Sequence, residues 1–449
     1  MKEKWNIKSS HSSKSTSQRG EELDGEPPID KLKIVYSIVL LHGIVVLLPW
    51  NMFITIAPNY YVNYWFTVDG NKTSYAKSFM SALGITAQIP NFSMSLISVM
   101  QIIGGSLMFR IAGPLALNCL NVAVILALVI FQDPNVDAMQ WFYIVSLAIA
   151  MLMNASNGLY QNSIYGLAAD FPPAYTNALM VGNNVCGTFI SILSIVETIC
   201  FPHNYKTVAI IYFSISLAVL VLCEILLLLL TRLLTTTFSL KDFYKYYVLK
   251  GQKSRLDQRT TRPSLSQFLE AFKMCWMQLL SVFLVFFVSL AVFPTVLVGT
   301  VPNKKGEPWN SAISRDLYPG VTTFLNFNLM AAIGSTLASF IQFPGPDKLL
   351  VVAMARLLFI PYFMLCNYNV DDRVMPVFFE NEWFFIIGNT IMAFTSGYYS
   401  SLGMMYAPKV VPDSLSKTAG MAAALCIVTG VMVGVAFTPV IATMVNNIG

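Results

Sequence analysis

Runs of apolar residues long enough to cross a lipid bilayer recur along almost the whole chain. Each run holds about 20 residues, the length that a helix needs to cross the hydrocarbon core, and polar stretches separate the runs. In hydrocarbon every backbone amide must be satisfied by the chain itself, so each run is predicted to be an α-helix. Only 11% of the 449 residues are charged, whereas a soluble domain has about 25%. The sequence therefore predicts an all-α polytopic membrane protein.

We predict eleven transmembrane helices, divided 6 + 5 by a basic segment. This division suggests two bundles that rock around a central site. The predicted organisation is a disordered cytoplasmic tail (1–32), a six-helix bundle (33–231), a cytoplasmic basic loop (232–274) and a five-helix bundle (275–449). The spans are expected near 33–56, 89–109, 113–132, 140–167, 178–200, 207–231, 275–299, 317–343, 348–367, 383–407 and 418–446.

The positions of Lys and Arg predict the orientation, because short cytoplasmic loops carry an excess of both. If the N-terminus is cytoplasmic, twenty of the 28 Lys and Arg residues fall on inner segments and seven on outer ones, while Arg356 lies within a span. We therefore expect a cytoplasmic N-terminus, and the odd number of spans then gives an extracellular C-terminus. The sequon at Asn71 falls in the first outer loop and is an expected glycosylation site. The expected location is the plasma membrane, because the tail has no obvious dileucine sorting signal.

The reactive residue types give no support for an enzyme. The three His residues fall in the tail, the first span and an outer loop, and the seven Cys are mostly within spans. No nucleotide-binding glycine loop or Cys-x-x-Cys pair is present, which argues against a pump, a metal site and a redox enzyme. We expect no cofactor, no catalytic residue, no nucleic-acid partner and no obligate protein partner. The expected contacts are a small-molecule substrate and membrane lipid.

Polar side chains inside the apolar runs are the strongest functional signal, because they are costly in lipid and tend to face a cavity. Spacings of three and four residues place several of them on common helix faces. An uncharged pocket of amides with Trp and Met would suit a flat, neutral solute that forms hydrogen bonds. The alternative is that these amides only join one helix to another. The faces are Asn154, Asn157 and Gln161; Asn91, Met94, Ser98 and Gln101; and Leu47, Trp50, Asn51 and Ile54.

A resemblance to a known family becomes specific at Leu47-Leu48-Pro49-Trp50-Asn51, which is similar to the Leu-Pro-Trp-Asn signature of the equilibrative nucleoside transporters. Further segments resemble the same family in the same order. They are 161–187 in the fourth-to-fifth span region, Phe327-Asn328 with Gly334 in the eighth span, Ala355-Arg356-Leu357 in the ninth, and Gly397-Tyr398 and Thr418-Ala419-Gly420 in the last two.

The resemblance implies an eleven-helix, major-facilitator-like fold. It also implies facilitative, sodium-independent transport of nucleosides or nucleobases by alternating access. Carried over by position, the substrate site would be lined by Leu47, Trp50, Ile54, Met94, Asn157, Gln161, Phe293 and Asn328.

Two departures from the family pattern concern the eighth and eleventh spans. The family usually has Asp and Arg at the positions of Ala331 and Ser335, and that pair is thought to engage ribose hydroxyls. It often has Glu at the position of Lys417. We count Ala331 and Ser335 among the site positions and expect a pocket that is roomier and less polar. Two alternatives stay open: a changed substrate such as an organic cation, and a sensor or scaffold that does not transport.

Overall fold

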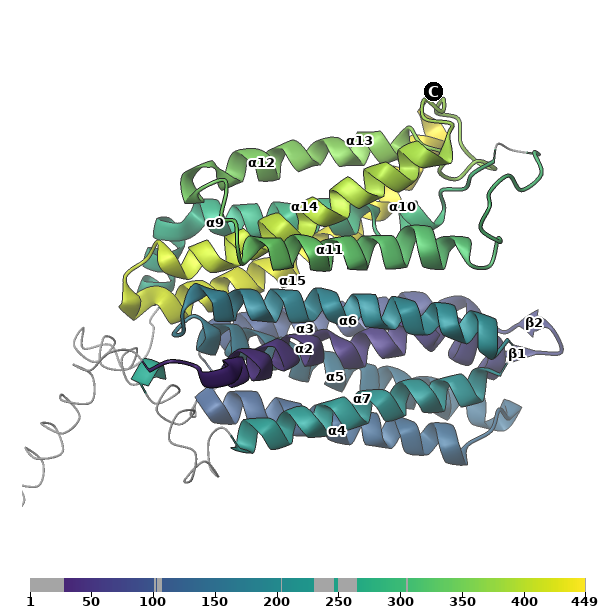
Figure 1. Ribbon diagram of the computed structural model, residues 1–449. Coiled ribbons are helices and arrows are strands. Elements are labelled where there is room, and N and C mark those ends of the chain that lie inside the picture. The colour runs from purple at the N-terminus through teal and green to yellow at the C-terminus, as the bar shows by residue number, and fades with distance from the viewer. Residues whose placement is uncertain are drawn as a thin grey trace, which may run out of the picture.

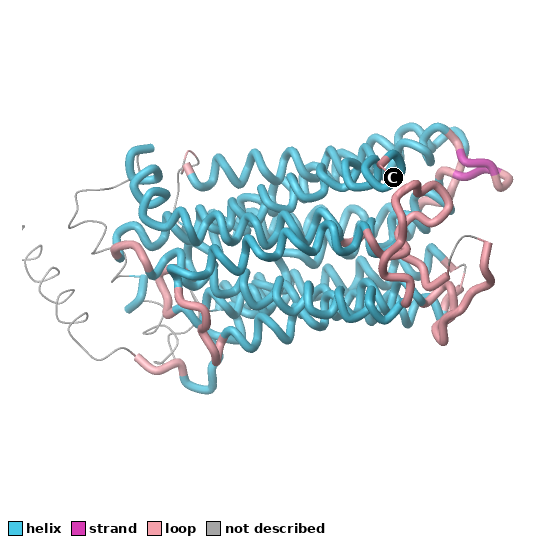
Figure 2. The backbone as a smooth tube through the Cα atoms, turned by 90° about the horizontal axis from the view of Figure 1, so that it is seen from above, coloured by secondary structure: helices cyan, strands magenta, loops and turns pink. Residues whose placement is uncertain are grey.

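The computed structural model describes residues 28–100, 102, 107–202, 204–229, 246–248, 265–303 and 306–448. Most of the predicted tail (1–32) and of the predicted basic loop (232–274) lies outside the described residues, as does Gln101. Within these ranges the chain is built of helices that run roughly parallel to one long axis, as Figure 2 shows in cyan.

The first half of the chain forms one layer of the molecule (Figure 1). After the short η1 turn (Lys31–Lys33), α2 is continued by a π-helical turn, and a hairpin of two short antiparallel strands precedes α3. A 3-10 turn (Val136–Ala138) precedes α5. The elements are α2 (Ile34–Ile56), the π-helical turn (Ala57–Trp65), β1 (Thr67–Val68), β2 (Asn71–Lys72), α3 (Ser74–Val99), α4 (Leu107–Phe131), α5 (Met139–Ala168), α6 (Pro173–Cys200) and α7 (Tyr205–Leu228).

The second half forms the other layer (Figure 1). A π-helical turn (Pro319–Leu325) leads into α11, and two 3-10 turns flank α12, at Pro346–Lys348 and Arg356–Leu358. The hairpin and the C-terminus lie at the same end of the molecule. The helices are α9 (Leu265–Val292), α10 (Thr295–Val298), α11 (Asn326–Ala338), α12 (Leu349–Ala355), α13 (Phe359–Met364), α14 (Glu382–Lys409) and α15 (Asp413–Asn447).

Among the described residues, eight helical segments are long and apolar enough to cross a membrane. They contain α2, α4, α5, α6, α7, α9, α11 and α15. The helices α3 and α14, and the run from α12 to α13, also coincide wholly or partly with predicted spans. The protein is therefore a multi-pass helical membrane protein, as the composition predicted.

The predicted second span, 89–109, was misplaced. The helix α3 covers Ser74–Val99, and the chain is no longer helical at Met100. Residues 74–88 include Lys77 and several Ser, so hydropathy alone suggested a loop there. The segment is helical because α3 packs along α5, which buries Phe79 and Leu83. The predicted start of the seventh span, at 275, was also late, since α9 begins at Leu265.

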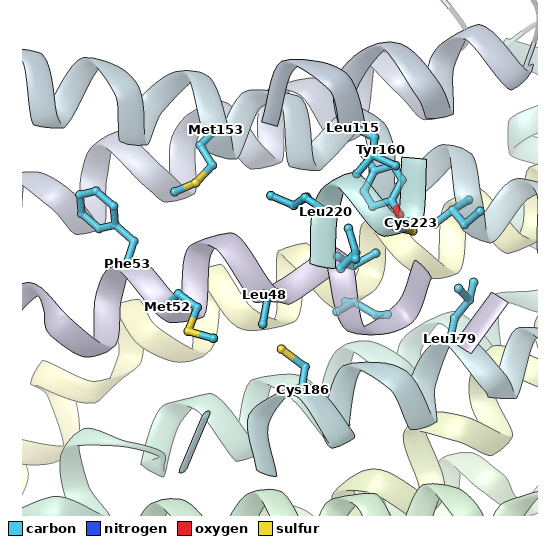
Figure 3. Packing of buried hydrophobic residues seen from close by; sticks show 14 of the residues in the cluster. Leu48, Met52, Phe53, Leu115, Met153, Tyr160, Leu179, Cys186, Leu220 and Cys223 are labelled. Carbon is cyan, nitrogen blue, oxygen red and sulfur yellow. The ribbon is translucent and has the colours of Figure 1, made fainter. Parts of the chain in front are cut away.

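A large apolar cluster fills the first layer and joins it to the second. Figure 3 shows its central part, where Leu48, Met52 and Phe53 of α2 lie near Met153 of α5 and Cys186 of α6. Phe53 stacks on Tyr61 with ring centroids 5.0 Å apart. This packing fixes the rotation of α2, which carries three of the predicted site residues.

Candidate functional site

The position of α2 is set by a close crossing with α6 at two glycines. A Cβ added at Gly182 would overlap the backbone oxygen of Leu40 and lie 2.9 Å from the Cα of Gly43. A Cβ added at Gly43 would in turn overlap the backbone oxygen of Leu179. The two backbones therefore touch here, as small residues allow in membrane helices. From this crossing α2 carries Leu47, Trp50 and Ile54 towards its other end, where all three are half-buried.

A buried hydrogen bond joins α2 to α5. The Nδ1 atom of His42 lies 2.6 Å from the hydroxyl oxygen of Tyr160, and the Cys223 thiol of α7 lies 3.4 Å from the same nitrogen. The His42 side chain is buried. Sequence reasoning did not group these three residues, because His42 is 118 positions from Tyr160 and 181 positions from Cys223. Their role in the fold is to fix the depth of α5 relative to α2.

The polar residues of α5 are all buried but differ in whether their side-chain atoms have a hydrogen-bond partner. The amide of Asn154 donates to the backbone oxygen of Ala150 at 2.9 Å, so it satisfies its own helix. Asn157, by contrast, is 6% exposed, and its Oδ1 atom has no partner within the described part of the chain. Gln161 lies one turn further on the same face and is 3% exposed. A desolvated carbonyl oxygen without a partner costs about 1–3 kcal/mol, and a donor on a solute would relieve that cost. The amide oxygens of Asn162 and Asn183 also have no partner among the described residues.

The helix α3 supplies the side wall of this region. The backbone and side-chain oxygens of Asn91 lie so close to Gly158 that no Cβ fits there. The Ser95 hydroxyl donates to the Gly158 oxygen at 3.4 Å. The helices α3 and α5 run in the same direction. Met94 follows Asn91 by three residues on α3 and is half-buried, and Gln161 follows Gly158 by three residues on α5. The structure therefore brings Met94 to the depth of Gln161.

Trp50 and Gln161 lie at different depths. Tyr160 is level with His42 through their hydrogen bond, and Trp50 is eight residues further along α2. At 1.5 Å per residue this separation is about 12 Å along the helix. The residues between these depths are Leu47 on α2 and Asn157 on α5. The predicted residues of the first layer therefore lie at several depths rather than at one level, and we call this set the column.

The predicted residues of the second layer pack mainly against protein. The ring of Phe293 stacks on that of Phe327 with centroids 4.1 Å apart. The Asn328 amide donates to the hydroxyl of Ser191 and to the backbone oxygen of Phe324, both at 3.0 Å. Ala331 and Ser335 are buried. In this conformation neither side chain is exposed, and α14 packs so closely on α11 that a Cβ added at Gly397 would overlap the backbone oxygen of Ala331.

The buried cation Arg356 belongs to a separate network within the second layer. Its guanidinium donates to the Ser289 hydroxyl at 2.7 Å, to the backbone oxygen of Met392 at 2.9 Å and to the Thr395 hydroxyl. All three partners are neutral oxygens on α9 and α14. Arg356 therefore ties the 3-10 turn between α12 and α13 to these helices, which is a structural role.

A pocket that the sequence did not predict lies where the loops between α5 and α6 and between α14 and α15 meet. Its volume is about 270 Å³, and its walls include Phe171, Thr176, Met405, Lys409 and Asp413. Tyr247 also lines it and contacts Phe171 edge-on, with ring centroids 6.0 Å apart. The residues that line the pocket therefore come from both layers. The loops that carry them lie at the end of the molecule opposite the β1–β2 hairpin (Figure 1).

Metal and disulfide chemistry have no site in the described part of the chain. It holds no group of three or more His, Cys, Asp and Glu that could bind a metal ion. All seven cysteines are free, including Cys200 and Cys366. The arrangement offers neutral amides, aromatic rings and a thioether, which suit binding of a neutral solute.

A family model for nucleoside transporters matches residues 147–443, well over half of the chain. The chain belongs to this family. It is 28% identical to human equilibrative nucleoside transporter 1 over 464 residues, covering 92% of this chain and 97% of that one. It is 27% identical to rat equilibrative nucleoside transporter 3, covering 91% and 88% of the two chains. An Arabidopsis thaliana equilibrative nucleotide transporter is 24% identical, with coverage of 91% and 86%.

The fold of this family member is similar to that of major facilitator superfamily transporters. The proton:xylose symporter XylE gives a TM-score of 0.58 at 12% identity, covering 88% of this chain and 86% of that one. FucP in its outward conformation gives 0.53 at 14% identity, covering 92% of each chain. The similarity confirms one part of the predicted fold class, a polytopic helical protein of the major-facilitator type, while the count of eleven helices and their 6 + 5 arrangement stay predictions.

Proposed function

We propose that this protein carries nucleosides or nucleobases across a membrane by facilitative, sodium-independent alternating access. The family assignment supports the substrate class, and the two-layer fold supports movement of one bundle against the other. The observation that carries the proposal is the α5 face. It presents the Oδ1 of Asn157, which has no partner among the described residues, and the buried amide of Gln161 one turn away. Amides of this kind can pair with a base edge or a sugar hydroxyl.

Because the residues of the column lie at different depths in the membrane, each would contact a different part of the solute. The indole of Trp50 would stack on one end of the solute, and Gln161 with Met94 would contact the other end. Asn157 would bond the middle. Leu47, Ile54 and Phe293 would supply apolar walls, while Asn328, Ala331 and Ser335 would shape the side formed by α11. A neutral column of this composition favours an uncharged, elongated solute over an organic cation, which would need a carboxylate.

The topology that goes with this proposal has eleven crossings, divided 6 + 5. The additional crossings beyond the eight apolar segments are α3, α14 and the run from α12 to α13. The N-terminus and the pocket that Lys409 lines, which we call the inner pocket, would face the cytosol. The hairpin with Asn71 and the C-terminus would face outside, and the membrane would be the plasma membrane. Asn71 is exposed, as a glycosylation acceptor must be.

The test is a panel of radiolabelled adenosine, uridine, hypoxanthine and a monoamine, supplied to transporter-null cells that express the protein. We expect uptake of at least one nucleoside or nucleobase, unchanged when sodium is replaced by choline. Uptake of the monoamine alone would establish the changed-substrate alternative. No uptake of any compound by protein detected at the cell surface would favour the sensor or scaffold and refute the proposal.

A further inference from the structure

The inner pocket combines an apolar interior with charged residues at its rim. Phe171 and Met405 are buried within it, and the ring of Phe171 contacts that of Tyr247 edge-on. Lys409 and Asp413 also line the pocket, and both are exposed. The pocket volume of about 270 Å³ is just below the range of about 300–1,000 Å³ that holds drug-sized molecules. The pocket therefore has room for one small organic molecule.

The charges at the rim are not paired with each other. The ion pair that the structure shows between described residues joins Lys206 to Asp133. Lys409 and Asp413 are four positions apart, and neither side chain has a hydrogen-bond or ion-pair partner within the described part of the chain. Asp170 adds a second carboxylate to the lining. The rim thus presents an ammonium group, which only donates hydrogen bonds, beside carboxylates, which only accept them.

The pocket is distinct from the column of predicted site residues. The end of α5 and the first turns of α15 touch at the edge of the pocket, where a Cβ at Gly420 would lie 2.7 Å from that of Ala169. The Ser416 hydroxyl donates to the backbone oxygen of Ala169 at 2.8 Å. Ala169 follows Gln161 by eight residues, which is about 12 Å of helix length. A ligand in the pocket would therefore occupy a different place from a solute bound at Gln161.

The chemistry of the lining selects one class of small ligand. A carboxylate binds the hydroxyls of a ribose, as it does in dinucleotide-binding folds. A lysine ammonium donates to the ring nitrogens and carbonyl oxygens of a base, and aromatic side chains pack on its flat faces. An anion fits less well because two carboxylates face it, and an organic cation would bring a second positive charge beside Lys409. A neutral ribonucleoside matches every group in the lining.

We propose that the inner pocket is a second binding site, specific for ribonucleosides. Asp413 accepts a hydrogen bond from a ribose hydroxyl, and Lys409 donates one to the base. The base lies against Phe171 and Tyr247. The ligand class rests on the proposed transport of nucleosides, but the selectivity of the pocket is its own. The column has no carboxylate to hold ribose, whereas the inner pocket does, so loss of the ribose hydroxyls should matter only in the pocket.

Protection of a cysteine tests the site without any transport. Pro408 lines the pocket and is half-buried, so Pro408→Cys in a Cys200→Ser background places a reactive thiol there. The full-length protein in lipid nanodiscs is treated with a thiol reagent, and the Cys200→Ser protein alone gives the background labelling. Adenosine should slow the labelling. Adenine, and dideoxyadenosine without either ring hydroxyl of ribose, should need at least about tenfold higher concentrations, because each lacks a hydrogen bond to a charged group. Equal protection by dideoxyadenosine, or none by adenosine, would refute the site.

The role of the carboxylate is tested at Asp413. Asp413→Asn keeps the shape of the side chain and should raise the half-protecting concentration of adenosine about tenfold. Because Asp413 also begins α15, where a carboxylate stabilises the helix, the decisive readout is the preference for adenosine over dideoxyadenosine, which should disappear. Asp347→Asn is the matched control, since Asp347 is exposed but does not line the pocket. A preference that survives Asp413→Asn would show that this carboxylate does not hold ribose.

The role of the cation and the class of ligand are tested together. Lys409→Met should weaken protection by adenosine several-fold and keep its preference over dideoxyadenosine, while the exposed control Lys348→Met should change neither. An unchanged Lys409→Met would remove Lys409 from the site. Protection by adenosine monophosphate as strong as by adenosine would identify an anion site, and protection by a monoamine alone a cation site; either would overturn the proposal. Uptake of adenosine without protection of the cysteine would refute this inference and leave the transport proposal intact.

Discussion

The glycine crossing of α2 and α6 gives the most quantitative prediction. Gly182→Ala would place a methyl group against the backbone oxygen of Leu40 and 2.9 Å from both the Cα of Gly43 and the backbone nitrogen of Ile44. Backbone atoms cannot rotate away as a flexible side chain can. The helix α2 must therefore move outward, and it carries Leu47 and Trp50 with it. We expect a loss of stability together with a raised KM.

The magnitude follows from two opposing effects. Overpacking of this kind costs about 1–3 kcal/mol, and replacing Gly by Ala inside a helix returns about 1 kcal/mol. The net loss for Gly182→Ala is then up to about 2 kcal/mol. Gly43→Ala meets the backbone of Leu179 in the same crossing and should cost about as much. Once α2 has moved to admit one methyl group, the second methyl group enters the same gap. The double variant should therefore lose about 1 kcal/mol less stability than the two single variants added together.

The assay is thermal unfolding of the detergent-solubilised protein, compared with the KM for uptake in cells. The matched control is Gly84→Ala on α3, where an added Cβ meets nothing within 4 Å. It should be neutral or slightly stabilising, by up to about 1 kcal/mol. Equal effects of Gly84→Ala and Gly182→Ala would refute the crossing as the cause. Strictly additive losses for Gly43→Ala and Gly182→Ala would show that the two methyl groups do not share a gap.

Three further predictions concern the pocket and the topology. Gln161→Ala should leave a group of the base unpaired and lower kcat/KM for uptake by a factor that corresponds to about 1–3 kcal/mol. An unchanged kcat/KM would remove Gln161 from the site. Asn71→Gln should abolish the mobility shift produced by a glycosidase, and a shift that persists would place the sugar elsewhere. The resemblance to the family implies a charged pair at the positions of Ala331 and Ser335. Without that pair the protein should hold ribose less tightly, so adenine and deoxyadenosines should compete for uptake nearly as well as adenosine. A steep loss of competition on removing either hydroxyl would contradict this expectation.

The fold class was predictable because burial in lipid is encoded locally. The length and composition of each apolar run are sufficient to predict that it crosses the membrane, without knowledge of the helices around it. The prediction failed for α3, whose first half is polar in composition. Phe79 and Leu83 are buried there by contact with another helix. The aromatic and aliphatic side chains of such a segment become informative only when the partner surface is known.

The sequence by itself determined the helical membrane fold and the helix faces on which the polar residues lie. Helical periodicity is sufficient for these inferences. Only the tertiary structure decided what each amide does. Asn154 bonds its own helix, Asn328 bonds α6, and the Oδ1 of Asn157 has no partner in the described chain. The three are alike in sequence spacing, but pairing depends on the depth and rotation of the neighbouring helix, which long-range contacts such as His42 with Tyr160 set.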